Sequence, residues 1–266
     1  MREFFGFGGY RRPAEGFLSW QHLTFVTILV LIATVLAVVL GRRNRTKDDK
    51  TKNRVLIVAA LAMDGLEVFK LIIECAREGS AHPLLLNLPL FLCSIQLITL
   101  PLAAFSKGRF REAALDFVLI FGPLGALMGT YGAGNNYGTY PVLCFDNVIS
   151  GLTHCIAGFA AVYIAIVGYA SMKRRNIWIT CCIMLGFCGV AYIADVLIPY
   201  NYMFLMNHDG TPYSIFYNLL NGNRVLYPLS VVVLFLLYIA AFYGVFYLIR
   251  HLRDRKKASA KSSDQA

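Results

Sequence analysis

Charged side chains are scarce in this sequence, because Asp, Glu, Lys and Arg together make up only 15% of its 266 residues. Hydrophobic residues make up 58%, a share that a soluble domain of this length rarely tolerates. The composition therefore disfavours a soluble enzyme and indicates a polytopic membrane protein.

Several other patterns are lacking. The seven cysteines are an odd number and contain no C-x-x-C pair, so neither a disulfide framework nor a metal site is expected. The net charge of +10 comes without a folded basic face or groove-reading element, so no nucleic-acid partner is expected either. No motif predicts a cofactor. The small-residue pattern "GALMG" at 125–129 is typical of helix packing, so it gives a homo-oligomer no support.

Long apolar runs are what the sequence does have. Each of seven runs holds roughly 18–25 residues, enough for a helix to cross a hydrocarbon core of about 30 Å. The runs cover residues 18–41, 55–76, 88–105, 113–130, 148–170, 177–199 and 228–250. We therefore predict an all-α fold, a polytopic membrane bundle of seven transmembrane helices in one domain over residues 1–250. The polar, basic tail 251–266 is predicted to be disordered.

Basic residues alternate between the connections. Nineteen of the 25 Lys and Arg residues lie in 42–54, 106–112, 173–175 and the tail from Arg250 onward. Only five lie in the connections on the other side. Because basic connections stay in the cytoplasm, we predict an integral protein of the cell membrane with the N-terminus outside and the C-terminus inside.

The second run carries a ladder of charges. A charge in hydrocarbon is costly, so such residues face inward and are functional candidates. Their spacings of 3, 3 and 4 place them on one helical face, and they are Asp64, Glu67, Lys70 and Glu74. Lys70 can pair with Glu67 or Glu74, which favours a self-neutralised structural ladder, whereas Asp64 has no such partner in its own helix.

Polar residues also mark the third and fifth runs. Pro89 suits the first turn of a helix, with Cys93 and then Gln96 on one face below it. A buried cysteine is usually a small hydrophobic filler. In the fifth run, His154 lies in a polar stripe with Asn147 and Ser150 that faces other helices.

Depth links these residues. Cys93 and His154 both lie roughly 8–9 Å below the outer boundary of their runs, and Asp195 falls in the same layer. A thiol nucleophile needs a base, and the base needs an orienting partner, roles that this trio would fill if their helices are neighbours. The external connection 200–227, rich in aromatics, would lie along the outer surface as a lid or as an interfacial anchor. The candidate substrate-binding residues are Gln96, Asn147, Ser150, Asn201 and Tyr202.

Four segments resemble a known family. "LPLFLCSI" at 88–95, the histidine of "GLTHC" at 151–155, "NYMFL" at 201–205 and "TPYSI" at 211–215 resemble the YwaF family of bacterial integral membrane proteins. That family is related to a eukaryotic transmembrane acyltransferase that remodels ether phospholipids. The resemblance implies that Cys93 accepts the acyl group and that His154 is its partner. Phe91 departs from the pattern, which has a histidine there, so His154 remains the base nearby.

Three functions compete at this point. The first is a membrane acyltransferase that moves an acyl group between membrane lipids through a Cys93 thioester, without coenzyme A. The second is a transporter or proton-coupled carrier with Asp64, Glu67 and Lys70 as its ion site, although carriers often show internal repeats and none is visible. The third is a non-catalytic membrane sensor or assembly protein.

Overall fold

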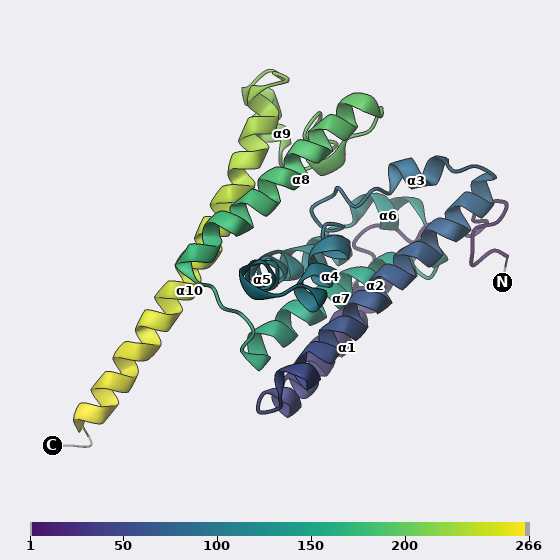
Figure 1. Ribbon diagram of the computed structural model, residues 1–266. Coiled ribbons are helices and arrows are strands. Elements are labelled where there is room, and N and C mark those ends of the chain that lie inside the picture. The colour runs from purple at the N-terminus through teal and green to yellow at the C-terminus, as the bar shows by residue number, and fades with distance from the viewer. Residues whose placement is uncertain (1, 264–266) are drawn as a thin grey trace.

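The structure is a computed structural model that describes the backbone of residues 2–263 and the side chains of residues 2–255. Over that range the regular elements are helices, without a strand (Figure 1). The α-helices are α1 (Trp20–Asn44), α2 (Asp49–Glu78), α3 (His82–Leu86), α4 (Gln96–Phe105), α5 (Gly108–Thr130), α6 (Gly134–Thr139), α7 (Phe145–Val167), α8 (Ile177–Leu197), α9 (Ser214–Leu219) and α10 (Leu226–Ser263). Two short 3-10 helices are η1 (Arg174–Asn176) and η2 (Tyr202–Phe204).

Local sequence signals set several helix ends. The Ser19 side chain accepts a hydrogen bond from the His22 amide and starts α1, and the Asp48 side chain caps α2 through the Thr51 amide. Helices α2 and α7 end at Gly79 and Gly168, whose φ angles of 68° and 79° are left-handed and favour glycine. The polar caps therefore delimit helices that the apolar runs predict only approximately.

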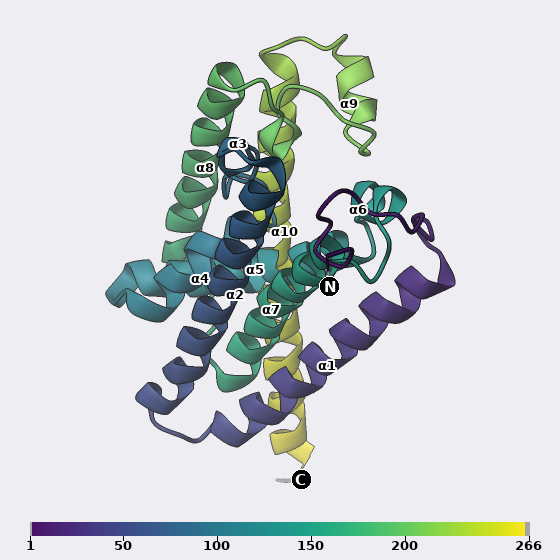
Figure 2. The same cartoon turned by 90° about the vertical axis from the view of Figure 1, so that its right-hand side faces the viewer.

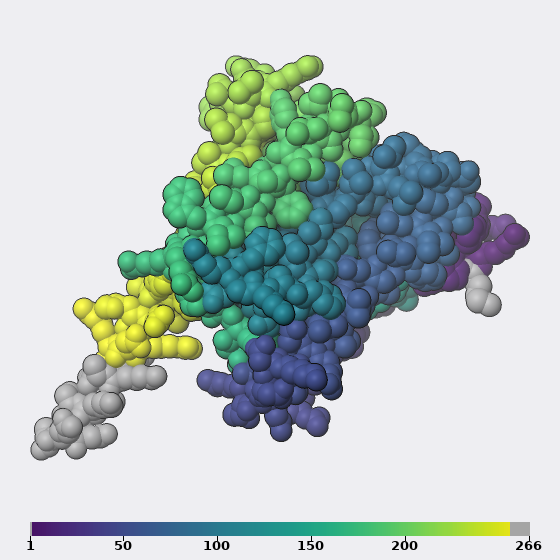
Figure 3. Space-filling view, in the orientation of Figure 1, coloured from purple at the N-terminus to yellow at the C-terminus, as the bar shows by residue number. Residues whose placement is uncertain are grey.

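Helices α5 and α7 form the centre of the molecule. Helix α7 packs against α5 on one side and α1 on the other, while α4 packs on α5, and α2 packs on both α4 and α7 (Figure 2). Helices α8 and α10 run side by side and contact this group through α5. The surface shows the same division, with the green and yellow C-terminal helices beside the blue and teal ones (Figure 3). Because α5 and α7 lie at the centre, their side chains border the interior of the bundle, where a functional site would lie.

Five segments of the described chain are long and apolar enough to cross a membrane. They are α1, Gly108–Thr139, α7, Arg174–Leu197 and Leu226–Arg255. Helix α2 is long enough, but its charge ladder lowers its hydropathy, and α4 has only 10 residues. The fold is thus an all-helical membrane bundle, and the count of seven spans stays a prediction.

The third apolar run is not one helix. Residues 88–95 form turns, and α4 begins only at Gln96, so the prediction of a helix starting at Pro89 is wrong. The Ser94 hydroxyl accepts from the Phe91 amide at 3.0 Å and donates to the Phe91 carbonyl at 3.1 Å. Such local side-chain bonds satisfy backbone groups outside a helix. Cys93 therefore lies in a turn rather than on a face of α4.

Helix α10 extends into the basic tail, for which the sequence predicts disorder. Helix α10 continues through residue 251 to Ser263, residues 264–266 lie outside the described range, and the disorder of the tail stays a prediction. Ala, Lys and Arg are favourable helix residues, and extending an existing helix needs no new nucleus. The apolar run therefore passes into the tail without a break.

The basic connections meet at one end of the bundle. Arg111 lies 3.6 Å from Asp49, and Lys173 lies 2.6 Å from Glu112, measured between nitrogen and carboxylate oxygen. These contacts join the segments 42–54, 106–112 and 173–175. At the other end Arg77 pairs with Asp146 at 2.7 Å, which joins α2 to the start of α7. The alternation of basic connections is thus a property of the fold, while the end that faces outward stays a prediction.

Candidate active site

A cavity of about 240 Å³ lies among α2, the turns of residues 86–94, α7 and Tyr200. Apolar walls come from Met63, Leu88 and Phe91. Five of the residues singled out from the sequence also line it: Glu67, Lys70, Cys93, Ser150 and His154. The structure therefore brings the candidate thiol and the candidate base to one cavity, together with one cation and one carboxylate.

Helix α7 fixes the orientation of His154. Its Nδ1 lies 2.6 Å from the Ser150 carbonyl oxygen, one turn earlier in the same helix. A carbonyl can only accept, so Nδ1 carries a proton, and in the neutral ring Nε2 then keeps its lone pair. The Ser150 hydroxyl lies 3.4 Å from the same Nδ1. The orienting partner of this imidazole is therefore the Ser150 residue of its own helix.

Cys93 reaches the cavity from the turns before α4. The thiol and the His154 imidazole lie within interaction range of each other, and each is half-buried. A neutral imidazole with a free nitrogen beside a thiol is an arrangement that can remove the thiol proton. Because these turns precede the helix, Cys93 projects from an irregular backbone against α7.

Two glycines of α5 make room for the pair. A Cβ added to Gly129 would lie 1.8 Å from Cδ2 and 2.1 Å from Nε2 of His154. A Cβ added to Gly125 would lie 3.7 Å from Cα of Cys93. The two glycines are four residues apart, about one helical turn. The small-residue pattern "GALMG" thus packs against this chain's own candidate site.

The charge ladder of α2 forms pairs beside the cavity. Lys70 Nζ donates to Glu67 Oε1 at 2.8 Å and to Asn87 Oδ1 at 3.1 Å. The Asn87 amide then donates to Glu74 Oε2 at 2.8 Å. One carboxylate oxygen of Asp64 is buried without a hydrogen-bond partner among the described residues. Lys70 is therefore already neutralised, and Asp64 stands outside this chain of contacts.

A larger polar vestibule of about 660 Å³ adjoins the cavity and shares Lys70, Asn87, Ser150 and Tyr200 with it. The Arg77 guanidinium there donates to both Asp146 oxygens, at 2.7 and 2.8 Å.

The N-terminal segment reaches the vestibule through Tyr10, whose hydroxyl donates to Asp146 at 2.6 Å. Burial and the Asp146 carboxylate both raise the pKa of Tyr10. Sequence reasoning missed Tyr10, Asn87, Arg77 and Asp146 here, because the pairs form between distant segments and no local spacing signals them.

Three predicted residues organise the outer loop instead. The Asp195 carboxylate accepts from the Tyr202 amide at 2.6 Å, and the Tyr202 hydroxyl donates to the Leu85 carbonyl. Asn201 donates to the Asn207 carbonyl at 2.7 Å. None of the three lines the cavity, so the structure does not bring Asp195 to His154.

Gln96 and Asn147 are fully buried but likewise do not line the cavity. Gln96 Oε1 accepts from the Thr99 hydroxyl at 3.0 Å, and Asn147 Nδ2 donates to the Pro141 backbone carbonyl at 3.0 Å. Phe91, which replaces the histidine of the resembling family, packs its ring against Tyr200 and Tyr202 at centroid distances of 5.9 and 5.2 Å. An aromatic wall therefore stands where a second imidazole was expected.

Comparison with known proteins places the chain in a family. A family model, that of the TMEM164 family, matches residues 17–252. Neither the curated proteins nor the solved structures contain a significant match. The matched range covers most of the chain and includes α1 to α9, the cavity and the part of the vestibule that α2, α6 and α7 line. The chain belongs to the TMEM164 family, a family of membrane proteins.

Proposed function

We propose that this protein is a membrane acyltransferase that moves a fatty acyl group from one phospholipid to another through a thioester on Cys93. The observation that carries the proposal is the convergence of Cys93 and His154 on one cavity, with Nδ1 of His154 held by the Ser150 carbonyl at 2.6 Å. That bond leaves Nε2 as the nitrogen that can take the thiol proton.

The reaction has two balanced steps. His154 takes the proton of the Cys93 thiol, and the thiolate attacks the ester carbonyl of the donor lipid. The C–O bond breaks, the lysolipid leaves as an alcohol with the proton from His154, and the acyl group stays as a thioester. The hydroxyl of the acceptor lysolipid then gives its proton to His154 and attacks the thioester, which restores the thiol.

Charge distribution supports a reaction without coenzyme A. The cavity and vestibule lie at the end of the bundle opposite the basic connections, which are expected in the cytoplasm. Acyl-CoA is absent outside, so the acyl donor in this proposal is a phospholipid. The proposed reaction also agrees with the resemblance to the YwaF family and to its ether-lipid acyltransferase relative.

The charge ladder supports the alternative of a carrier less well. Glu67 and Lys70 do line the cavity, which is the observation in favour of an ion site. Lys70 is however already held by Glu67 and Asn87, an arrangement suited to structure or to contact with a lipid headgroup.

A labelled lipid tests the proposal directly. Purified protein incubated with a phospholipid carrying a labelled acyl chain should form a covalent adduct that maps to Cys93 by peptide mass spectrometry. Hydroxylamine should release the label, because it cleaves thioesters. No adduct at Cys93 with any phospholipid donor would refute the mechanism. Cys182→Ser, an exposed thiol of α8, is the matched control and should keep the adduct.

The side of the membrane has its own test. An impermeant thiol reagent added to intact cells should label a cysteine placed at Gly138 and should not label one placed at Thr51. Gly138 lies in α6 at the cavity end, and Thr51 lies in the basic connection region. The reverse labelling would place the cavity in the cytoplasm and remove the argument against acyl-CoA as donor.

A further inference from the structure

A second, apolar groove lies on another part of the bundle. It has a volume of about 450 Å³ and runs between α1 and α2 over the surface of α7. These two helices converge at their shared loop and diverge away from it (Figure 2). Its lining is apolar apart from Arg54 and the Cys155 thiol. The α7 residues that line it, Leu152 to Phe159 at helical spacing, occupy a different face from His154.

The length of the groove matches one leaflet of a bilayer. Along α1 the lining residues run from Leu29 to Leu40, which are 11 positions apart and therefore about 16 Å along the helix axis. Half of a hydrocarbon core of about 30 Å is about 15 Å. One acyl chain of a phospholipid would therefore fill the groove from end to end.

A cation stands at one end only. Arg54 is exposed near the start of α2, beside the basic connection 42–54. It forms no ion pair with a carboxylate in residues 2–255, in contrast to Arg77 and Arg111. A guanidinium is well suited to bind a phosphate through two parallel hydrogen bonds. The groove thus combines an apolar slot with a phosphate-binding group at the end where a lipid headgroup would lie.

We propose that this groove binds an anionic phospholipid of the cytoplasmic leaflet, with one acyl chain between α1 and α2 and the phosphate on Arg54. The surrounding loop 42–54 carries seven Lys and Arg residues, which favour a headgroup with a net negative charge. The site is separate from the Cys93 cavity, so the inference stands whether or not Cys93 is a nucleophile.

Lipid binding to the delipidated, full-length protein tests the inference. We expect native mass spectrometry to show binding of phosphatidylglycerol in preference to phosphatidylcholine. Arg54→Gln should weaken phosphatidylglycerol binding about tenfold, the size of one charge-assisted bond, and should weaken phosphatidylcholine binding less, because the choline cation already offsets the charge of its phosphate. A phosphatidylglycerol with a photoreactive acyl chain should label lining residues such as Leu36 and Val58.

A filling variant separates the groove from the general lipid-facing surface. Val58→Trp places a large ring in the slot and should abolish retention of phosphatidylglycerol. Val68→Trp is the matched control, because Val68 is exposed to 55% on the same helix, close to the 61% of Val58, but does not line the groove. Equal lipid retention by both variants, labelling spread evenly over α8 and α10, or a second protein chain in place of the lipid would each overturn the proposal.

Discussion

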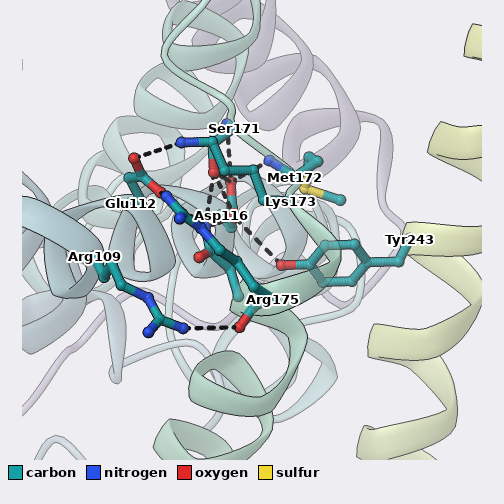
Figure 4. Close-up of polar contacts among 9 residues, drawn as sticks. Arg109, Glu112, Asp116, Ser171, Met172, Lys173, Arg175 and Tyr243 are labelled. Atoms are coloured by element: carbon teal, nitrogen blue, oxygen red, sulfur yellow. Dashed lines mark hydrogen bonds and ion pairs between the residues drawn. The ribbon is translucent and has the colours of Figure 1, made fainter.

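Two polar clusters at opposite ends of α5 differ in how completely their central side chains are hydrogen-bonded. At the basic end Asp116 is fully buried and accepts hydrogen bonds from Met172 N at 2.9 Å, Asn176 Nδ2 at 3.1 Å and the Tyr243 hydroxyl at 3.3 Å (Figure 4). At the other end the side chains of Cys93 and His154 face an open volume of about 240 Å³.

The difference separates a structural cluster from a candidate site. The bonds of Asp116 tie α5 to the loop before α8 and to α10, and they come from both backbone and side chains. Both oxygens of the Asp116 carboxylate are bonded, while Asn176 Oδ1 in the same cluster is buried without a partner among the described residues. A carboxylate held in this way rigidifies the fold and is not free to react. The His154 ring, in contrast, is held through one nitrogen only, so the other nitrogen remains available to a ligand in the cavity.

The largest expected effect is on acyl transfer at the cluster of Cys93 and His154. Cys93→Ser and His154→Ala should each lower the rate of transfer by about 10³-fold or more, and the double variant should be about as inactive as either single one. Transfer of a labelled chain between lipids in proteoliposomes measures the rate, and circular dichroism checks the fold. Should Cys93→Ala keep full activity, the thiol is a packing residue and the contrast between the two clusters loses its functional meaning.

Substitution in the Asp116 cluster should lower the stability of the protein. Asp116→Ala leaves buried donors of the loop and of Asn176 without an acceptor, so we expect the free energy of unfolding to fall by about 3 kcal/mol. Thermal unfolding in detergent should show a lower midpoint. The fraction that remains folded should transfer acyl groups at the wild-type rate per molecule. Normal stability with lost transfer would show that the chemistry extends to this end.

Gly129→Ala tests the fit between α5 and the imidazole. The added methyl group would overlap the His154 ring, so the ring must move, and a misplaced catalytic base costs about 10²-fold in rate. The rate should fall more than the unfolding midpoint does. Gly186→Ala in α8 is the control, because a Cβ there meets nothing within 4 Å and the activity should be unchanged. Equal activity of the two variants would contradict the assignment of His154.

The smallest expected effect is a loss of stability on substitution in the charge ladder of α2. Lys70→Met removes the partner of Glu67 and should lower the free energy of unfolding by about 1–2 kcal/mol, measured as folded yield and unfolding midpoint. Adding Glu67→Gln should recover most of that loss, since it removes the unpaired carboxylate. Wild-type stability of Lys70→Met together with lost ion-dependent uptake of a solute would instead favour a carrier.

The sequence predicts those features that local composition determines. The positions of the long helices follow from hydropathy, and the alternating basic connections follow from counts of Lys and Arg. The helical rise places Cys93 and His154 at one depth, and both do line one cavity. That depth estimate assumed a helix through Cys93, however, and residues 88–95 are turns because the hydropathy of a run does not distinguish a helix from a buried turn.

Contacts between distant segments were beyond prediction. Arg77 and Asp146 are 69 positions apart, and nothing in either neighbourhood indicates the bidentate pair they form. The sequence predicts Asp195, another ionisable side chain, as the orienting partner of His154, whereas the nearest partner of Nδ1 is the carbonyl of Ser150 in the same helix. Backbone groups carry no residue-specific signal, so a pattern of side-chain types cannot reveal such a role.

The glycines of α5 also constrain how this family can vary. Gly122 has no room for a Cβ, which would lie 2.7 Å from the Ala157 carbonyl, and Gly129 has none against His154. Leu127 and Met128, between them and exposed to 51% and 56%, have no such constraint. Among relatives we expect one face of this helix to stay fixed as glycine while the adjacent face exchanges freely among apolar residues. The same helix would then contain positions that hardly vary among relatives and positions that vary freely.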